Sequence, residues 1–362
     1  MSRPLIRTLT TTTRRSNSSL HNVSQSHSSV LPPIEKLLWR HGEDTMIEEF
    51  RRRAFIPETP VLITSEDPAR GVWDGVVGAG RKWFVSESGG ESKVVLEYLG
   101  RFGETILPYE LVLPENLDGD VKWGKDVEEE NISKILALVA QRKPQTQHES
   151  PLLNEAISTL YSQTTPSQTF HRFHAPLSLL LYASILTSTS TSTSQSSIPQ
   201  PTLQNLYIAQ AQLLDLPPEL RADLPLPSLV LHAGKGDLYD ANLWLGIPPT
   251  YTPLHADPNP NLFVQLAGRK RVRLFPKEVG RGMLGLARGN GGFGGIGIRG
   301  EEMMEGKERR VLDGLVWGGD ESGKGREVVV REGEGLFVPR GWWHCVVSVG
   351  EGVNGSVNWW FR

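Results

Sequence analysis

The chain has 362 residues, a net charge of −3 and a hydrophobic content of 38%, with ten tryptophans. This composition excludes a wholly disordered chain and allows one large domain or two small ones. The small net charge gives no global electrostatic reason to expect nucleic acid or an anionic membrane as a partner, and no apolar run approaches the roughly 18 residues of a transmembrane helix. The single cysteine, Cys345, cannot form an internal disulfide, which is typical of a protein in a reducing compartment.

The first 34 residues differ in composition from the rest of the chain. They contain Arg3, Arg7, Arg14 and Arg15, many serines and threonines, and no acidic residue. Such a composition is typical of a mitochondrial presequence, although a disordered polar leader has a similar one. We therefore expect residues 1–34 to be a presequence or disordered leader and the protein to be mitochondrial, with the cytoplasm or nucleus as the alternative.

Residues 35–200 are expected to form a mixed helix and strand part of the fold. Residues 35–56 have apolar residues among charged ones and are interpreted as helical. The runs "TPVLITSEDP" (59–68) and "ETILPYELVLP" (104–114) are interpreted as strands that end at turn residues. Apolar residues at helical spacing predict a helix over residues 130–143.

Two polar motifs later in this part carry no expected chemistry. "HRFH" (171–174) has two histidines at helical spacing, but a surface or structural pair explains them better than a zinc site does. The Ser/Thr-rich stretch at 187–197 has no side chains that could form a core, so we expect an exposed linker.

Residues 201–362 are predicted to be a core of short strands separated by Gly and Pro. This pattern favours a β-sandwich or barrel over a doubly wound fold, because no strand–helix–strand alternation is visible. A Gly-rich insertion at about 280–325 contains "GIGIRG" (295–300), a formal match to a dinucleotide-binding motif. We expect a surface loop there, because the motif needs a strand before it and a helix after it.

Three residues of this core could bind one metal ion. His255 and Asp257 lie two residues apart in an alternating run, and such side chains share one face of a strand. The pair alone is weak evidence, because an exposed turn explains it equally well. His344, 89 residues later at the start of an apolar run, completes a set of two histidines and one carboxylate, which suits non-haem Fe(II). Cys345 should point to the opposite strand face from His344, so it is a poor fourth ligand for structural zinc.

Lys270 is predicted to point into the core. Alternation in "RKRVRLF" places it on one face with Val272 and Leu274 and places the three arginines on the other. A buried ammonium is costly unless an anion pairs with it. No acid alternates opposite this lysine, so we expect the carboxylate of a ligand as its partner. The alternative is a partly solvated face from which the lysine reaches water.

These motifs resemble the JmjC/cupin-like Fe(II) and 2-oxoglutarate dioxygenases, in particular the small hydroxylase branch that includes the asparaginyl hydroxylase of hypoxia-inducible factor. The resemblance runs from about residue 47 to the end. It rests on "LYIAQ", "TPLHAD", "NLFVQLAGRKRVRLFP", "GEGLFVPRGWWH" and "SVNWWF". It implies a mainly β fold, a double-stranded β-helix (jelly-roll, cupin-like) with flanking helices.

Carried over by position, the resemblance also implies the roles of individual residues. The implied Fe(II) ligands are His255, Asp257 and His344. The implied 2-oxoglutarate pocket consists of Tyr207, Thr252, Asn261, Lys270 and Asn358. The implied reaction uses O2, converts 2-oxoglutarate to succinate and CO2 by oxidative decarboxylation, and hydroxylates a substrate.

A protein or peptide side chain is the expected substrate. Within the same superfamily the alternatives are a tRNA-base hydroxylase, supported by the arginines of "RKRVRLF", and a lysine demethylase, although many demethylases have Glu where this chain has Asp257. An alternative of another class is a non-oxygenase metal-binding cupin, but Thr252, Lys270 and Tyr207 would then have no common task. The chain ends four residues after Asn358, so we expect no dimerisation through C-terminal helices and leave the oligomeric state open.

Overall fold

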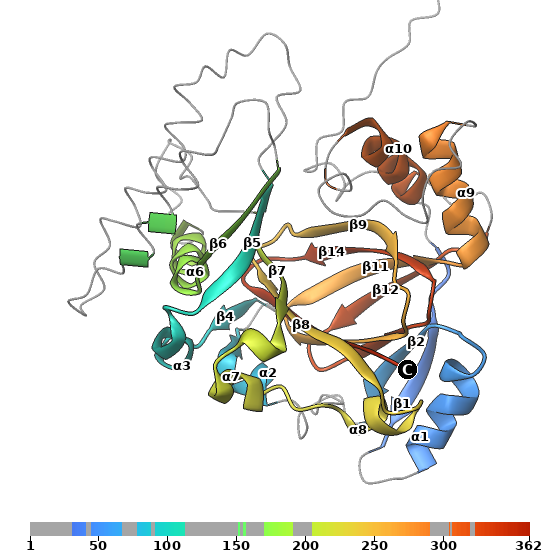
Figure 1. Cartoon of the computed structure of the whole chain (residues 1–362), viewed down its shortest axis with the longest axis horizontal. Coiled ribbons are helices and arrows are strands. Elements are labelled where there is room, and N and C mark those ends of the chain that lie inside the picture. The colour runs from blue at the N-terminus through green and yellow to red at the C-terminus, as the bar shows by residue number, and fades with distance from the viewer. Residues whose placement is uncertain are drawn as a thin grey trace, which may run out of the picture.

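A computed structural model describes residues 31–40, 45–66, 78–87, 91–112, 151–152, 155–156, 170–190, 205–289, 304, 306–318 and 323–362. Two β-sheets dominate these residues (Figure 1). The larger sheet has nine strands in the order β1-β2-β13-β10-β15-β8-β7-β5-β6, and the smaller has four in the order β12-β11-β14-β9. This arrangement confirms the predicted jelly-roll. The expected presequence (apart from 31–34), the predicted helix over 130–143 and the "GIGIRG" motif lie outside the described residues.

Antiparallel pairing builds both sheets, and only the pairing of β1 with β2 is parallel among the described strands. The larger sheet contains β1 (Glu35–Trp39), β2 (Val61–Ser65), β5 (Ile106–Val112), β6 (Phe170–Pro176), β7 (Leu206–Gln212), β8 (Leu238–Gly246), β10 (Asn261–Ala267), β13 (Gly335–Val338) and β15 (Asn354–Phe361). The smaller sheet contains β9 (Tyr251–Ala256), β11 (Arg269–Phe275), β12 (Arg326–Arg331) and β14 (Trp343–Val349). A separate pair is formed by β3 (Phe84–Ser86) and β4 (Ser92–Val94).

The two sheets enclose an apolar core to which β11 contributes every second side chain. Val272 and Leu274 of β11 are 1% and 0% exposed, and they pack with Leu62 and Leu336 of the larger sheet. Lys270 shares this inward face and is 1% exposed. The prediction that this lysine points inward is therefore confirmed. The alternation that places Val272 and Leu274 in the core also places the Lys270 ammonium in the interior.

Two helices, α9 (Lys277–Arg288) and α10 (Gly306–Trp317), cover the outer face of the smaller sheet (Figure 1). They occupy much of the described part of the predicted insertion, where we expected a surface loop. Arg273 on this outer face is fully buried. Its guanidinium donates to the Val316 carbonyl and the Glu327 carboxylate and lies 4.5 Å from the ring centroid of Trp317. The outer arginine therefore holds α10 onto β11.

Further helices lie around the larger sheet, and α6 lies beside β5 and β6 in Figure 1. They are α1 (Thr45–Phe50), α2 (Ala79–Trp83), α3 (Leu96–Leu99), α6 (Ser178–Ser190), α7 (Pro218–Ala222) and α8 (Ser228–His232), with π or 3₁₀ segments at Arg51–Phe55, Gly100–Phe102 and Leu213–Asp215. Among the described residues no helix is long and apolar enough to span a membrane.

Two local predictions differ from the structure, those for residues 35–56 and 187–190, and the "HRFH" motif lies on a strand despite its helical spacing. Residues 35–56 are not helical throughout, because β1 (Glu35–Trp39) pairs with β2 and buries Leu37. "HRFH" lies in strand β6, where pairing with β5 imposes a period of two and buries His171 and Phe173 while Arg172 is exposed. The first residues of the expected Ser/Thr linker, 187–190, complete helix α6, and the rest of that stretch lies outside the described residues.

Gly280 sets how closely α9 approaches the smaller sheet. A Cβ atom on this glycine would lie 2.0 Å from Cγ of Trp343, the residue next to His344. We expect Gly280→Ala to lower the free energy of unfolding by about 1–3 kcal/mol, the usual cost of overpacking, measured by urea denaturation. Gly282→Ala on the same helix is the control. A Cβ there meets nothing within 4 Å, so it should stabilise by about 0.5–1 kcal/mol. Equal effects of the two changes would contradict the packing described.

Candidate metal centre and ligand cavity

Three predicted ligands meet at one end of the smaller sheet. His255 on β9 and His344 on β14 are direct partners in the strand register, with ring centroids 4.2 Å apart. Asp257 follows the last residue of β9. Its carboxylate oxygens lie 3.9 Å from Nε2 of His255 and 3.7 Å from Nε2 of His344. One ligand atom from each residue falls within 4.8 Å of the others, so the fold brings together residues that are 89 positions apart.

Hydrogen bonds orient both imidazoles for metal binding. Nδ1 of His255 lies 2.8 Å from the carbonyl oxygen of Pro253, and Nδ1 of His344 lies 3.2 Å from that of Trp342. A carbonyl can only accept, so each Nδ1 carries a proton, and in the neutral imidazole Nε2 is then the atom with the free lone pair. Both free lone pairs are on the atoms nearest the Asp257 carboxylate, which is the tautomer that a metal ligand needs.

The protonation states of His344 and Asp257 also suit a cation. Burial, together with the positive charge that His255 carries when protonated, lowers the pKa of His344 to about 4, so this histidine is neutral at pH 7. Burial alone would raise the pKa of Asp257, but the two histidines and its hydrogen bonds hold it below its usual value. Asp257 and His344 therefore offer a carboxylate and a neutral imidazole to a metal ion without first losing protons.

A chain of side-chain hydrogen bonds holds the Asp257 carboxylate. Its Oδ2 accepts from Trp360 Nε1 at 2.8 Å and from Asn261 Nδ2 at 3.2 Å. The Asn261 amide oxygen accepts from Asn358 at 3.1 Å, and the Asn358 oxygen accepts from Trp244 at 2.7 Å. The predicted pocket residues Asn261 and Asn358 thus orient the carboxylate as well as line the cavity. Trp244 was not predicted, since only the register of β8 with β15 brings it here.

Lys270 ends in the same cavity and has no acidic partner among the described residues. Its Nζ donates to Ser356 Oγ at 2.7 Å and to Tyr207 Oη at 3.2 Å, and it lies 5.4 Å from the ring centroids of Tyr207 and Phe263. None of these groups is an anion, and burial lowers the pKa of Lys270 to about 7. A buried ammonium with only neutral neighbours fits an incoming carboxylate. Ser356 was missed by sequence reasoning.

A β-bulge explains how Thr252 joins this cavity. His255 pairs with His344 and Thr252 pairs with Val346, so two residues of β9 lie opposite the single Cys345 of β14. In a regular strand, residues three positions apart point to opposite faces of the sheet. The extra residue of the bulge places Thr252 on the same face as His255. Thr252 also forms a hydrogen bond with Tyr207.

One cavity of about 780 Å³ contains all eight predicted site residues. It is large enough for a small dicarboxylate beside the three ligands, because ligand sites are commonly about 300–1,000 Å³. The residues present fit both groups that the sequence predicted: a divalent metal at the His255, Asp257 and His344 atoms, and an anion at Lys270. Trp343 and Trp360 line this cavity, whereas Trp359 is buried in the main core.

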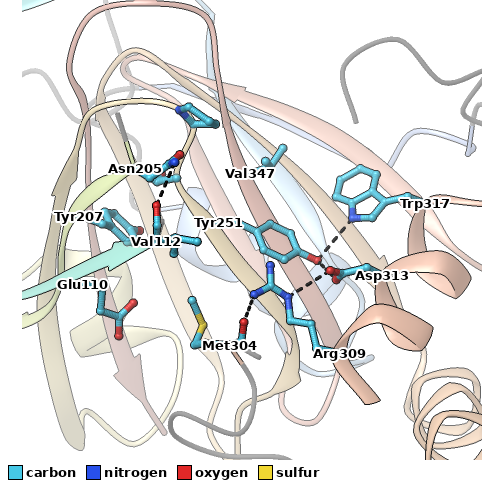
Figure 2. Close-up of a pocket in the computed structure, with 12 residues that line it drawn as sticks. Glu110, Val112, Asn205, Tyr207, Tyr251, Met304, Arg309, Asp313, Trp317 and Val347 are labelled. Carbon is cyan, nitrogen blue, oxygen red and sulfur yellow. Dashed lines mark hydrogen bonds and ion pairs between the residues drawn. The ribbon is translucent and has the colours of Figure 1, made fainter. Parts of the chain in front are cut away.

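A second, smaller cavity of about 70 Å³ lies between α10 and β9 (Figure 2). Tyr251, the first residue of β9, donates its hydroxyl to Asp313 of α10 at 2.5 Å and lies under the Arg309 guanidinium, 4.8 Å from the ring centroid. Nε of Arg309 donates to the same carboxylate at 3.1 Å, and Trp317 Nε1 donates to the Tyr251 hydroxyl at 3.4 Å. These contacts fasten α10 to the strand that carries His255.

Comparison with known proteins agrees with this fold. The sequence model of the cupin-like domain family matches residues 77–289 and 316–362. This chain belongs to the cupin-like domain family. The described residues that carry the two-sheet fold and the three ligands fall almost entirely within the matched segments, whereas most of α10 lies in the gap between them.

Several curated relatives of this cupin-like protein have names that refer to JmjC domains or demethylation. Lysine-specific demethylase JMJ30 of Arabidopsis thaliana is 32% identical over 175 residues, which are 46% of this chain and 35% of the relative. Lysine-specific demethylase 8 of Danio rerio is 43% identical over 73 residues, 20% and 18% of the two chains. Jumonji C domain-containing protein 5 of Drosophila melanogaster is 28% identical over 163 residues, which are 44% of this chain and 37% of the relative. The matched part is well under half of each relative's length.

Proposed function

We propose that this protein is an Fe(II)- and 2-oxoglutarate-dependent dioxygenase that hydroxylates a side chain of a protein. The observation that carries the proposal is the presence, in one cavity, of a two-histidine, one-carboxylate set and a buried lysine without an acidic partner among the described residues. A non-oxygenase cupin would need the first feature but not the second. Burying an ammonium is costly, so its presence favours a carboxylate ligand.

In this proposal each residue has a defined task. His255, Asp257 and His344 would hold Fe(II) and leave positions open for ligands. Lys270, with Tyr207 and Thr252, would bind the distal carboxylate of 2-oxoglutarate. When bound, iron, 2-oxoglutarate and O2 supply the oxidation that converts a substrate C–H to C–OH and 2-oxoglutarate to succinate and CO2. The protein itself contributes ligand orientation, the carboxylate site and a partly enclosed cavity.

The names of the relatives support a protein substrate and favour one further candidate, lysine demethylation. Both reactions would use the same site, because hydroxylation of an N-methyl carbon leads to loss of the methyl group as formaldehyde. The resemblance to the asparaginyl hydroxylase branch favours stable hydroxylation.

The proposal is tested by turnover. The purified protein with Fe(II), ascorbate and 2-oxoglutarate should form succinate, and the Asp257→Asn variant should not. Incubation with a proteome digest then separates the candidates by mass spectrometry: a gain of one oxygen on a peptide indicates hydroxylation, and loss of a methylene equivalent from methyl-lysine indicates demethylation. Succinate formation equal in wild type and Asp257→Asn would contradict the proposal.

The lowered pKa of Lys270 predicts that 2-oxoglutarate binding depends on pH. The ligand-free ammonium loses its proton above about pH 7, whereas the bound carboxylate would stabilise the charged form, so binding must take up a proton at higher pH. The apparent affinity should therefore fall by about tenfold for each pH unit above 7. Calorimetry between pH 7 and 8.5, with Co(II) as a redox-stable replacement for iron, measures this. Lys270→Arg stays charged and is the control; the same pH dependence in both proteins would contradict the assignment.

A further inference from the structure

The rim of the large cavity carries two arginines that the proposed chemistry does not use. Arg281 lies on α9 and Arg340 lies in the turn between β13 and β14, and both line the cavity while remaining exposed. Within the described residues neither forms an ion pair or a side-chain hydrogen bond. They differ in this respect from the other rim cations. Lys277 pairs with Glu58 at 2.5 Å, and Arg172 pairs with Glu110 at 2.7 Å.

The charge of the cavity has the opposite sign to that of the whole chain. The net charge of the protein is −3, yet the charged residues lining the cavity are five basic and three acidic, namely Arg172, Lys270, Lys277, Arg281, Arg340, Glu58, Glu110 and Asp257. An Fe(II) ion and a 2-oxoglutarate dianion would add no net charge to this set. The excess of positive charge therefore remains available to a third ligand, the substrate.

Packing fixes the backbone beside each unpaired arginine. Gly280, which precedes Arg281, lies directly against Trp343 of β14. Gly341, which follows Arg340, has a φ of 72° and donates its N–H to the Asp257 carbonyl oxygen at 2.9 Å. Both guanidiniums thus extend from backbone that is anchored to the residues around the metal ligands. Guanidinium groups can bind carboxylates in bidentate geometry.

We propose that the substrate is an acidic protein segment, with Asp or Glu side chains that bind Arg281 and Arg340 while the target residue enters the cavity. This inference rests on the proposed function for the identity of the reaction, but its binding test does not need turnover. We favour a peptide over RNA because the proposed reaction acts on a protein side chain. Only two of the described arginines at the rim lack a partner, whereas binding of a nucleic-acid backbone usually neutralises several phosphates.

The experiment measures fluorescence anisotropy with four labelled probes: the peptides (Glu-Gly)4, (Gln-Gly)4 and (Lys-Gly)4, and a 12-nucleotide oligo(U). The proteins are the full-length wild type, Arg281→Gln/Arg340→Gln, and the matched control Arg52→Gln/Arg269→Gln, whose two arginines are exposed and line neither cavity. Each is measured with and without Co(II) and 2-oxoglutarate.

The wild type and the control should bind (Glu-Gly)4 about tenfold more tightly than (Gln-Gly)4, and Arg281→Gln/Arg340→Gln should lose this preference. The preference should weaken with added salt, as expected for exposed charges. Equal binding of the two peptides by the wild type, or a preference that survives in Arg281→Gln/Arg340→Gln, would overturn the proposal. Tighter binding of oligo(U) than of (Glu-Gly)4 through the same arginines would also overturn it, in favour of a nucleic-acid substrate. A failure of succinate formation, by contrast, would overturn only the proposed reaction.

Discussion

Replacement of Lys270 by methionine should weaken 2-oxoglutarate binding by about a hundredfold or more, the usual cost of removing one partner of a buried, hydrogen-bonded charge pair. Metal binding should change little, because Lys270 contacts Tyr207 and Ser356 and none of the three metal ligands. Calorimetric titration of the Co(II)-loaded protein with 2-oxoglutarate measures the affinity for 2-oxoglutarate. Calorimetric titration of the metal-free protein with Co(II) alone measures the affinity for the metal.

Two features make the Lys270→Met result specific. Methionine keeps an unbranched apolar stem and lacks only the terminal ammonium, so it fills nearly the same space. The ligand-free variant should be at least as stable as the wild type, because it no longer buries an ammonium without an anionic partner. Arg269→Gln, whose side chain is exposed next to Lys270 in β11, is the control for a general loss of positive charge. Unchanged 2-oxoglutarate affinity in Lys270→Met would remove the lysine from the site.

Replacement of Asp257 by asparagine should lower the affinity for a divalent metal by more than the roughly 10–100-fold that outer-shell changes usually cost. The amide has nearly the same shape as the carboxylate but no charge, and only this charge balances a cation held between His255 and His344. Competition of Co(II) between the protein and a chelating dye measures the effect.

A graded series tests the same point. Asn261→Ala removes a hydrogen bond to Asp257 but leaves the three ligands in place, so its loss of metal affinity should be smaller than that of Asp257→Asn. Asp237→Asn, an acid whose carboxylate pairs with Arg362 away from the cavity, should have no effect. Metal affinity of Asp257→Asn within error of the wild type would show that the three residues do not act as a set.

The parts of the site that follow strand alternation could be predicted from the sequence. Lys270 is buried because it shares a strand face with Val272 and Leu274. Residues at every second position of a strand share a face, so this grouping can be found from the sequence alone. The direct pairing of His255 with His344 depends instead on strand register, which spacing alone does not reveal. The residue types suggested that the two histidines could share a metal, and the family resemblance implied that they do.

Other features depend on tertiary contacts that have no local signature. The bulge that turns Thr252 toward the cavity places two residues of β9 opposite one residue of β14. The sequence of either strand alone does not show this mismatch. The histidines of "HRFH" are on a strand because β5 pairs with them, which outweighs their helical spacing. Helix α10 follows glycines that suggested a loop, yet its contacts with Tyr251 and Arg273 hold it on the sheet.

The measurement that tests the central claim most directly is anaerobic absorption spectroscopy. The purified protein is loaded with Fe(II), 2-oxoglutarate is added without O2, and the visible charge-transfer band of a chelated keto acid is recorded, with His255→Ala as the control. We predict a band in the wild type that is absent from His255→Ala. Iron bound to the wild type without such a band would contradict the account and would favour a metal-binding cupin without oxygenase activity.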